Sequence, residues 1–483
     1  MTLFYNAGLS FLITLHNNME HQLPQSFLQS LENVEGFDSN AFVAIHEEAK
    51  PLTSIRFNPN KKIDVQDSVL QLESKIPWST HGYYLKERPS FTKDPLFHAG
   101  AYYVQEASSM FLEQALQQTL DLNNSIKVLD LCAAPGGKST LIQSLISKDS
   151  LLVSNEVIKT RVNVLAENIT KWGAANVVVT NNDPRDFQRL DSYFDVIVVD
   201  APCSGSGLFR KDPDAISEWS LDNVDLCSQR QQRILADVKD ALKRDGILIY
   251  STCSYSTAEN EHIAEWLITE NGFESMQLQI NPEWNIIETI TKQTNAYGYR
   301  FYPDKVKGEG FYIAAFKKTN STPNAKQTQR PTLNNQRQTP NTKQLTNNPK
   351  QQIANWLSSN ELSLFPWKDD IIAIPQNLLN EIPVLQTALY IKKAGVNIGS
   401  LIRNELIPSH QLAMSTILNP NVAAVSLDLN SALQYLRLEL IEKDFDGTGW
   451  MLVKYGGLAL GFIKALPNRI NNYYPREWRI LTK

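Results

Sequence analysis

The stretch Lys127-Val-Leu-Asp-Leu-Cys-Ala-Ala-Pro-Gly-Gly-Lys138 predicts a buried strand that runs through a tight glycine turn into a helix. Its first five residues form a short, mainly apolar run of the kind found in parallel strands. Gly136 and Gly137 allow the backbone to approach a ligand, because no Cβ stands in the way. A helix that starts above the carboxyl end of a strand offers free N–H groups to nucleotide-like ligands. Taken alone, the unit is equally typical of any α/β protein.

The alternation of strand and helix continues after Lys138. Short apolar runs predict strands at 151–154, 177–180, 194–199, 246–250 and 309–316. Helical spacing predicts helices at 159–172 and 225–244, and Ser256 with Glu259 is expected to form a capping box that opens another helix. Strands that alternate with helices predict a doubly wound α/β sheet.

Each expected strand of this sheet ends in a polar or reactive residue. Glu156 lies about 20 residues beyond the glycine turn, where an acidic side chain meets ribose hydroxyls in nucleotide-binding folds. Asp183 follows the third strand and could meet an adenine amino group. Asp200 and Cys203 follow the fourth strand, and Cys253 follows the fifth. Because the carboxyl ends of parallel strands share one edge, we expect these groups to converge on one crevice.

The four cysteines are Cys132, Cys203, Cys227 and Cys253. None lies in a CxxC pair or near His at ligand spacing, so we expect no metal site, and scattered free thiols favour a reducing cytoplasm. A lone cysteine is more often a small buried hydrophobe than a nucleophile, and this interpretation suits Cys132 and Cys227. Cys203 and Cys253 instead follow buried strands in polar loops, where a nearby helix start stabilises a thiolate.

Three motifs, in this order, resemble the RNA cytosine-C5 methyltransferases of the Nop/Sun family. They are Asp130-Leu-Cys-Ala-Ala-Pro-Gly-Gly-Lys138, Asp200-Ala-Pro-Cys203 and Ser251-Thr-Cys253, and the likeness covers residues 102–318. The rest of the chain is similar to the bacterial RsmF-type rRNA members, which carry a small domain before the catalytic one and a PUA-like domain after it. That second likeness is carried by Ile398-Gly399, Pro408-Ser-His410 and Asn471-Asn-Tyr-Tyr-Pro475.

The resemblance implies a Rossmann-like class I methyltransferase domain that uses S-adenosylmethionine. We expect this α/β domain at 105–318, a small N-terminal α+β RNA-binding domain at 20–104 and a β-rich PUA-like domain at 353–483. Residues 319–352 are rich in Asn, Gln, Thr and Pro and carry five bases and no acid, so they are expected to form a flexible basic linker. Residues 1–19 are expected to be a disordered extension, with Met1 or Met19 as the true start.

The resemblance also implies roles for single residues. Cys253 would add to C6 of cytosine, Asp200 would support the charge that builds at N3, and Cys203 would assist release of the product. Asp200 could instead only orient the cofactor. The cofactor contacts that the resemblance implies are Cys132, Ala133, Ala134, Pro135, Gly136, Gly137, Lys138, Glu156, Arg161, Asp183 and Asp200.

Basic residues among aromatic ones predict RNA contacts outside the crevice, because rings stack on bases and cations hold phosphates. The tail from residue 449 onward carries six bases and one acid. Charged turns and solvated rims are the competing interpretation of all these positions. The candidate RNA contacts are Arg56, Arg210, Lys211, Lys464 and Arg469.

Length and composition exclude little. The chain has 483 residues, 42% of them hydrophobic, and a net charge of −5, so any RNA surface must be a local basic patch. No segment is apolar enough to cross a membrane. We expect a cytoplasmic monomer that acts on 16S rRNA or the small ribosomal subunit. The alternatives are a tRNA methyltransferase, a non-catalytic RNA-binding assembly factor, which loss of a motif cysteine would favour, and a DNA cytosine-C5 methyltransferase, against which the Thr-Cys motif counts.

Overall fold

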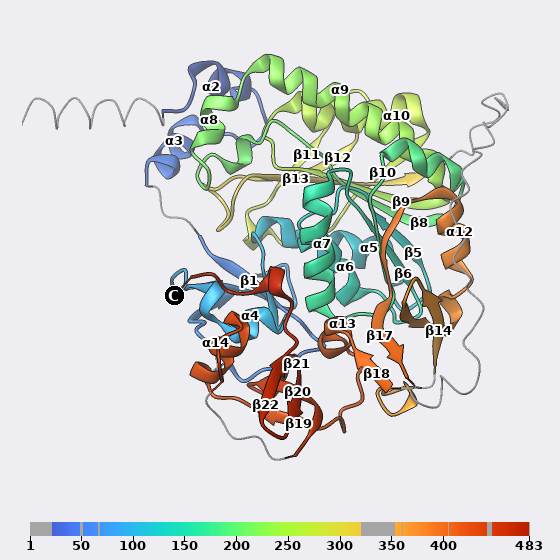
Figure 1. The fold of residues 1–483 in the computed structure, drawn as a ribbon. Helices are drawn as coiled ribbons and strands as arrows, with labels where there is room; N and C mark the ends of the chain where they lie inside the picture. Colours follow the sequence, from blue (N-terminus) through green and yellow to red (C-terminus); the bar gives the residue numbers. More distant parts are fainter. Residues whose placement is uncertain are drawn as a thin grey trace, which may run out of the picture.

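The computed structural model of the chain describes residues 22–48, 52–65, 68–319, 353–359, 361–403, 405–441 and 447–482. A large α/β layer lies above a lower part that is built from smaller sheets (Figure 1). The extension expected at 1–19 lies outside the described residues, and so does the expected linker apart from Thr319. Every helix in the described ranges is too short or too polar to cross a bilayer.

The centre of the molecule is a ten-stranded sheet with a parallel middle. Five parallel strands run in the order β7-β6-β5-β8-β9, so the chain moves outward from β5 in both directions. The predicted doubly wound α/β sheet is confirmed. Ligands bind such sheets beyond the carboxyl ends of the strands at this reversal. The parallel strands are β5 (Lys127–Asp130), β6 (Leu151–Asn155), β7 (Val177–Thr180), β8 (Phe194–Asp200) and β9 (Leu242–Thr252).

Antiparallel strands extend the sheet at both edges. β16 (Ile391–Ala394) pairs with β7, although it comes from the region beyond residue 353. The expected domain boundaries stay predictions, but a strand from the expected C-terminal domain completes the sheet of the central one. The strands beyond β9 are β13 (Phe311–Lys318), β12 (Tyr297–Phe301), β11 (Ile287–Ile290) and β10 (Phe273–Met276).

Helices cover both faces of the sheet with their buried apolar residues. The helix at 159–172 was predicted with its exact bounds. The helix expected at 225–244 spans Leu221–Val238 instead. It ends earlier than expected because the buried Leu242 already pairs with Phe194 of β8. One face carries α5 (Leu112–Thr119), α6 (Gly137–Leu145) and α7 (Lys159–Trp172), and the other carries α9 (Leu221–Val238), α10 (Glu261–Asn271) and α12 (Glu381–Ala388).

The N-terminal part forms a four-stranded sheet in the order β2-β3-β1-β4. The two helices that precede it lie apart from that sheet, beside α8 (Asp214–Glu218) (Figure 1). There Phe27 and Phe42 pack against Phe209 and Tyr255, which follow the two cysteine motifs. The elements are α2 (Gln25–Leu31), α3 (Ser39–Glu47), β1 (Ser54–Phe57), β2 (Leu72–Lys75), β3 (Gly82–Leu85), α4 (Pro95–His98) and β4 (Tyr102–Val104).

The C-terminal part contains two further four-stranded sheets. The last of them packs against the N-terminal part, where Ala99 shares a core with Tyr435 and Tyr474. The first sheet holds β14 (Leu362–Trp367), β15 (Asp370–Pro375), β17 (Val396–Ile402) and β18 (Glu405–Pro408), followed by α13 (His410–Met414). The second holds β19 (Ala424–Ser426), β20 (Gly449–Tyr455), β21 (Leu458–Leu466) and β22 (Arg469–Asn472), with α14 (Leu429–Arg437).

Candidate active site

The glycine turn between β5 and α6 lies at the carboxyl edge of the sheet. Gly136 has a φ of 118°, a left-handed conformation that a residue with a Cβ rarely adopts. Asp130, which is fully buried at the end of β5, accepts a hydrogen bond of 2.6 Å from the Ser139 hydroxyl and so ties the strand to the first turn of α6. Burial raises the pKa of Asp130 to about 7.

A pocket of about 150 Å³ opens beside this turn. It is lined by the turn, by Asp200 and by the chain from Tyr103 to Glu106, which follows from β4. The residues of this last segment were not predicted as site residues. The turn residues on the pocket wall are Cys132, Ala133, Ala134, Pro135, Gly137 and Lys138.

Glu156 and Arg161 are linked to the same turn. Glu156 follows β6, is 3% exposed and accepts a hydrogen bond of 2.9 Å from the backbone N–H of Ile158. Arg161 lies 3.5 Å from the other carboxylate oxygen and donates to the carbonyl of Ala134 at 2.6 Å. The structure therefore brings the predicted ribose-binding acid, the predicted arginine and the glycine turn into one cluster.

Asp183 lines a neighbouring hollow of about 710 Å³, together with Val157, Asn182 and Tyr390. Its carboxylate accepts a hydrogen bond of 3.2 Å from the N–H of Arg185 and caps a short 3-10 helix. The side chain of Asn182 exchanges two hydrogen bonds with the backbone of Tyr390, at 2.9 and 3.1 Å. The C-terminal part of the chain thus reaches the loop that carries Asp183.

The two motif cysteines meet at the ends of β8 and β9. The sulfur atoms of Cys203 and Cys253 lie 3.2 Å apart. Hydrogen bonding to Cys253 and burial raise the pKa of Cys203 well above its usual range, so this thiol is protonated at neutral pH. By contrast, Cys227 is buried in α9, and burial raises the pKa of Cys132, as expected for unreactive thiols.

Asp200 lies at the same edge as the cysteine pair. Its carboxylate forms an ion pair of 2.7 Å with Lys138 and accepts a hydrogen bond of 2.8 Å from the Ser251 hydroxyl. Burial opposes the charge on Lys138, but the nearby carboxylate outweighs burial and raises the pKa of Lys138. The crevice therefore combines a thiol pair, a carboxylate and an ammonium group on neighbouring strand ends. Within the described residues no group of His, Cys, Asp or Glu is arranged to hold a metal ion.

Family models match three successive parts of the chain. The model described as 16S rRNA methyltransferase RsmB/F matches residues 117–317. The N-terminal domain of 16S rRNA methyltransferase RsmF matches residues 23–107, and the methyltransferase RsmF PUA domain matches residues 422–480.

Curated relatives match nearly end to end. Ribosomal RNA small subunit methyltransferase F of Aeromonas salmonicida is 30% identical over 482 residues, which cover 96% of this chain and 98% of the relative. The protein of the same name from Shewanella loihica is 29% identical over 94% of this chain and 95% of its own. The chain belongs to the RsmF family of rRNA methyltransferases. The resemblance seen in the sequence is confirmed, and the chain is an S-adenosylmethionine-dependent rRNA methyltransferase.

Solved structures agree on the fold. NSun6 from Pyrococcus horikoshii, determined with the S-adenosylmethionine analogue SFG, superposes with a TM-score of 0.52 at 21% identity. The match covers 62% of this chain and 99% of that one. The crystal structure of PH0851 gives a TM-score of 0.55 at 23% identity, with 63% of this chain and 68% of that chain covered. The glycine turn fits the cofactor of the family, because the start of α6 lines the pocket and the left-handed Gly136 and the oriented acid Glu156 belong to the same cluster around the turn.

Two residues that were predicted to contact RNA in this RsmF-family chain are buried instead. Arg56 is 2% exposed, because its guanidinium donates to Gln105 at 2.9 Å and to Thr140 at 2.6 Å and lies over the ring of Trp172. The side chain of Arg210 is 5% exposed and lies 3.5 Å from the carboxylate of Glu309. Their sequence neighbours suggested an RNA-binding surface, but the two guanidinium groups lie inside the molecule.

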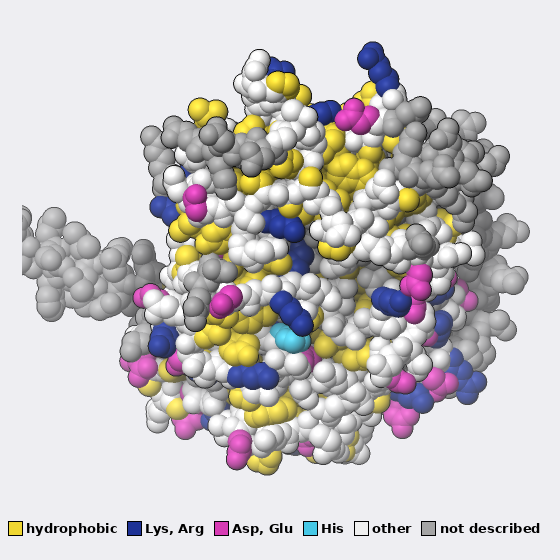
Figure 2. Space-filling model, turned by 90° about the horizontal axis from the view of Figure 1, so that it is seen from below, with side chains coloured by type: hydrophobic (Ala, Val, Ile, Leu, Met, Phe, Trp, Pro, Cys, Tyr) yellow, Lys and Arg dark blue, Asp and Glu magenta, His cyan; other side chains and the backbone are white. Residues whose placement is uncertain are grey.

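The other candidate RNA contacts are accessible. Lys211 and Arg469 are exposed, and Lys464 pairs with Glu405 at 2.9 Å over the ring of Trp450. Figure 2 views the molecule from the side of the PUA-matched sheet: Lys and Arg side chains lie in the middle of this face as well as at its rim, whereas Asp and Glu lie chiefly towards the rim. This arrangement suits a polyanionic substrate, and the individual contacts stay predictions.

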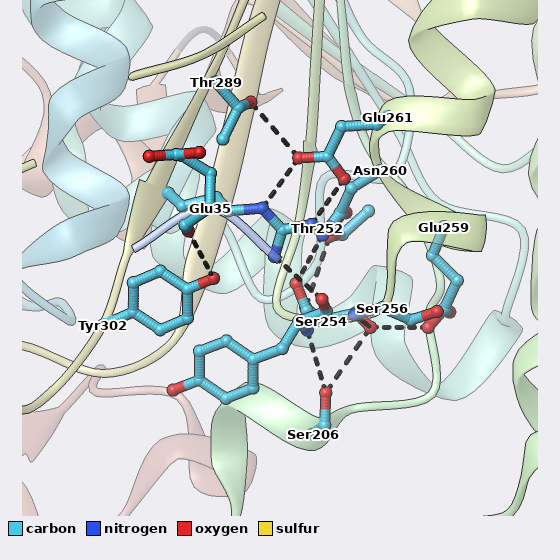
Figure 3. A network of polar contacts seen from close by, with 12 residues as sticks. Glu35, Ser206, Thr252, Ser254, Ser256, Glu259, Asn260, Glu261, Thr289 and Tyr302 are labelled. Carbon is cyan, nitrogen blue, oxygen red and sulfur yellow. Dashed lines mark hydrogen bonds and ion pairs between the residues drawn. The ribbon is translucent and has the colours of Figure 1, made fainter. Parts of the chain in front are cut away.

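The predicted capping box is wrong. Ser256 makes no side-chain bond to the helix, and Glu259 is fully buried and directed away from it. The carboxylate of Glu259 accepts hydrogen bonds from Ser204 and Ser254, which directly follow the two motif cysteines. Figure 3 shows the contact between Glu259 and Ser254. Sequence spacing alone could not reveal this role, because Ser204 lies 55 residues away along the chain.

Proposed function

We propose that this chain methylates C5 of a cytosine in 16S rRNA, with Cys253 as the nucleophile and Cys203 as the residue that assists release. The observation that carries the proposal is the pair of sulfur atoms 3.2 Å apart at the edge of the cofactor pocket. Two thiols on neighbouring strand ends suit a reaction that forms and then breaks a covalent bond to the base. The names of the curated relatives support the small-subunit rRNA as substrate.

The first step is addition to the base, which must leave its stack to enter the crevice. The thiolate of Cys253 forms a bond to C6, and the electron pair of the C5–C6 double bond moves onto C5 and the ring. Asp200 lies beside Lys138 and Ser251, and its carboxyl group in the protonated form donates to N3 as this charge builds, because N3 of cytosine is an acceptor. When bound, S-adenosylmethionine supplies an electrophilic methyl group. The residues that would hold it are those of the glycine turn, together with Glu156, Arg161, Asp183 and Asp200.

The second step is release of the enzyme. A proton leaves C5, its electron pair restores the C5–C6 double bond, and the bond from C6 to the Cys253 sulfur breaks. Hydrogen bonding to Cys253 is the largest cause of the raised pKa of Cys203. That cause weakens once the Cys253 sulfur is bonded to C6, so more of Cys203 is then the thiolate that can accept the C5 proton.

A denaturing gel of enzyme incubated with RNA and S-adenosylmethionine tests the roles of the two cysteines. Cys203→Ala should stay covalently attached to RNA and give a shifted band, because addition proceeds and elimination stalls. Cys253→Ala should give no such band and no methyl transfer. Cys227→Ala, which removes a buried thiol of α9, should behave as wild type. Trapping by Cys253→Ala instead would exchange the roles, and activity in both variants would contradict the covalent mechanism.

The RNA and the assembly state are part of the proposal. We expect the enzyme to act as a monomer, and an rRNA substrate supports a cytoplasmic enzyme. Methylation of naked 16S rRNA, of small ribosomal subunits and of tRNA should be compared side by side. The proposal expects the ribosomal substrates to be preferred, and preference for tRNA would favour the alternative.

A further inference from the structure

The carboxylate of Glu259 lies behind the cysteine pair and joins the two loops that carry it. Glu259 is fully buried. One carboxylate oxygen accepts from the backbone N–H of Ser204 at 2.7 Å, and the other accepts from the hydroxyls of Ser204 and Ser254 at 2.6 and 2.5 Å. Figure 3 shows Glu259 beside Ser254, with Ser206 below it. Each serine is the residue that follows a motif cysteine.

Burying a carboxylate is costly, and the surrounding donors offset that cost. Burial raises the pKa of Glu259, whereas the hydrogen bonds from Ser204 and Ser254 act in the opposite direction. Gln231 of α9 donates to Glu259 at 3.3 Å and to the carbonyl of Pro202 at 3.0 Å. A buried acid with this many donors holds its neighbours in one arrangement, because any other arrangement would leave donors or the carboxylate unpaired.

The two cysteine loops depend on Glu259 to different extents. The loop of Cys253 continues the paired strand β9 and has a second support, because Asn260 accepts from the Thr252 hydroxyl at 2.6 Å and donates to the carbonyl of Ser254 at 2.8 Å. Between Pro202 and Ser204, Glu259 and Gln231 bond the backbone of the Cys203 loop, whereas the contacts of this loop with Ser254 and Cys253 join only side chains, at 3.3 and 3.2 Å. Loss of Glu259 would therefore loosen the loop that carries Cys203 more than the loop that carries Cys253.

We infer that Glu259 is a positioning residue that holds Cys203 against Cys253 and thereby controls the release step. This inference rests on the proposed function, since it concerns the same two cysteines. Glu259 does not touch the base in this arrangement. It acts through Ser204, which fixes the place from which Cys203 reaches the C5 proton.

The test measures how fast enzyme leaves methylated RNA, using full-length protein, 16S rRNA and S-adenosylmethionine. Glu259→Gln keeps the size of the side chain but loses the charge that strengthens its hydrogen bonds. We expect release to slow by roughly tenfold, the effect of one weakened charge-assisted bond, so that the shifted band accumulates while methyl transfer to the bound base persists. Ser204→Ala removes one of these bonds with little risk to folding and should shift release in the same direction.

Three control variants make the result specific. Ser256 joins the Glu259 network through its backbone N–H, which donates to the Ser254 hydroxyl, so Ser256→Ala keeps this bond and should release RNA as wild type does. Asn260→Ala should instead reduce formation of the covalent band, since it loosens the Cys253 loop. Cys203→Ala on the same gel reports whether the two-cysteine mechanism holds at all.

The outcomes separate the inference from the proposed function. If Cys203→Ala is trapped but folded Glu259→Gln and Ser204→Ala both release at the wild-type rate, the inference is wrong and the proposed function stands. Equal losses of addition and release in Glu259→Gln would assign it a merely structural role and would also overturn the inference. If Cys203→Ala is not trapped, the proposed function itself fails.

Discussion

Side chains at the carboxyl edge of the sheet lie in close polar pairs. Lys138 balances Asp200 at 2.7 Å, and Cys203 shares a hydrogen bond with Cys253 at 3.2 Å. Away from the crevice, the buried Arg56 is hydrogen-bonded to polar groups of the protein rather than to RNA. Arg56 contacts the backbone carbonyl of Gly137 at 3.2 Å and so supports the start of α6 from behind.

Replacing Arg56 therefore tests whether its charge serves stability or RNA binding. Arg56→Met should lower the free energy of unfolding by about 1–3 kcal/mol, because buried polar partners lose their donors. Thermal unfolding measures this, and the RNA affinity of the folded protein should stay unchanged. The matched control is Lys211→Met, which replaces an exposed lysine. Its free energy of unfolding should stay within about 0.5 kcal/mol of the wild-type value. The slope of log K against log salt for RNA binding should fall by the contribution of about one phosphate contact. Weaker RNA binding by Arg56→Met at full stability would contradict this account.

At the scale of elements, the unexpected feature is β16. This strand crosses from the C-terminal part to the edge of the central sheet, where Lys393 pairs with Val179 of β7. Lys393 is 8% exposed and donates to the carbonyl of Gly395. Burial lowers its pKa from 10.5 to about 7, so the folded protein binds this proton less tightly than the unfolded chain does.

Lys393→Met should reveal that difference as a pH dependence of stability. The unfolded chain holds the lysine proton up to about pH 10.5 and the folded protein only up to about pH 7, so wild type gains stability as the pH rises between these values. The variant lacks this gain. It should therefore have the higher thermal midpoint at pH 7, and its advantage should shrink towards pH 10.5. A difference in midpoint that does not change with pH would contradict the assignment.

Helices and strands were predictable from the sequence where the pattern of their own residues is enough to indicate them. The strands at 151–155 and 177–180 each begin with three apolar residues and are buried throughout, and α7 repeats its apolar residues with helical spacing. The start of β9 and the role of β16 were not predictable in this way. Residues 243–245 are polar and suit a helix surface as well as a sheet edge, and β16 owes its conformation to the partner strand β7.

The candidate site also has features that the sequence predicts and features that it does not. The glycine turn, Glu156, Asp200 and the motif cysteines follow strands directly, so the topology of a parallel sheet predicts their common edge. Buried polar contacts depend on residues far apart in the sequence. Arg210 meets Glu309 and Glu259 meets Ser204 only after folding, and no spacing along the chain indicates either pair.

At the scale of the whole molecule, the flanking parts are built into the catalytic layer. The buried apolar residues of α12 share a core with those of α9, and the C-terminal sheet packs against the N-terminal part. The backbone of Tyr390 anchors Asn182, the neighbour of Asp183. Cofactor binding and RNA binding are therefore expected to depend on different segments of the region beyond residue 353.

Two truncated chains separate these contributions. A chain that ends at Lys318 loses α12 and β16 and exposes the apolar face beneath them, so it should have a lower thermal midpoint and weakened S-adenosylmethionine binding by calorimetry. A chain that ends at residue 421 keeps both elements and loses the PUA-matched segment. It should bind the cofactor better than the shorter chain but bind RNA with a flatter dependence on salt. Equal cofactor affinity in both would contradict a role for β16.

The central claim is that Cys253 makes 5-methylcytosine in 16S rRNA, and mapping of methylated cytosines tests it most directly. Small-subunit rRNA from a deletion strain would be compared with rRNA from the same strain carrying wild type, Cys253→Ala or Cys227→Ala, by bisulfite sequencing and mass spectrometry of nucleosides. We predict that one or more 5-methylcytosines are lost on deletion, return with wild type and Cys227→Ala, and stay absent with Cys253→Ala. An unchanged map after deletion, full restoration by Cys253→Ala, or a methyl group on the exocyclic nitrogen would contradict the claim.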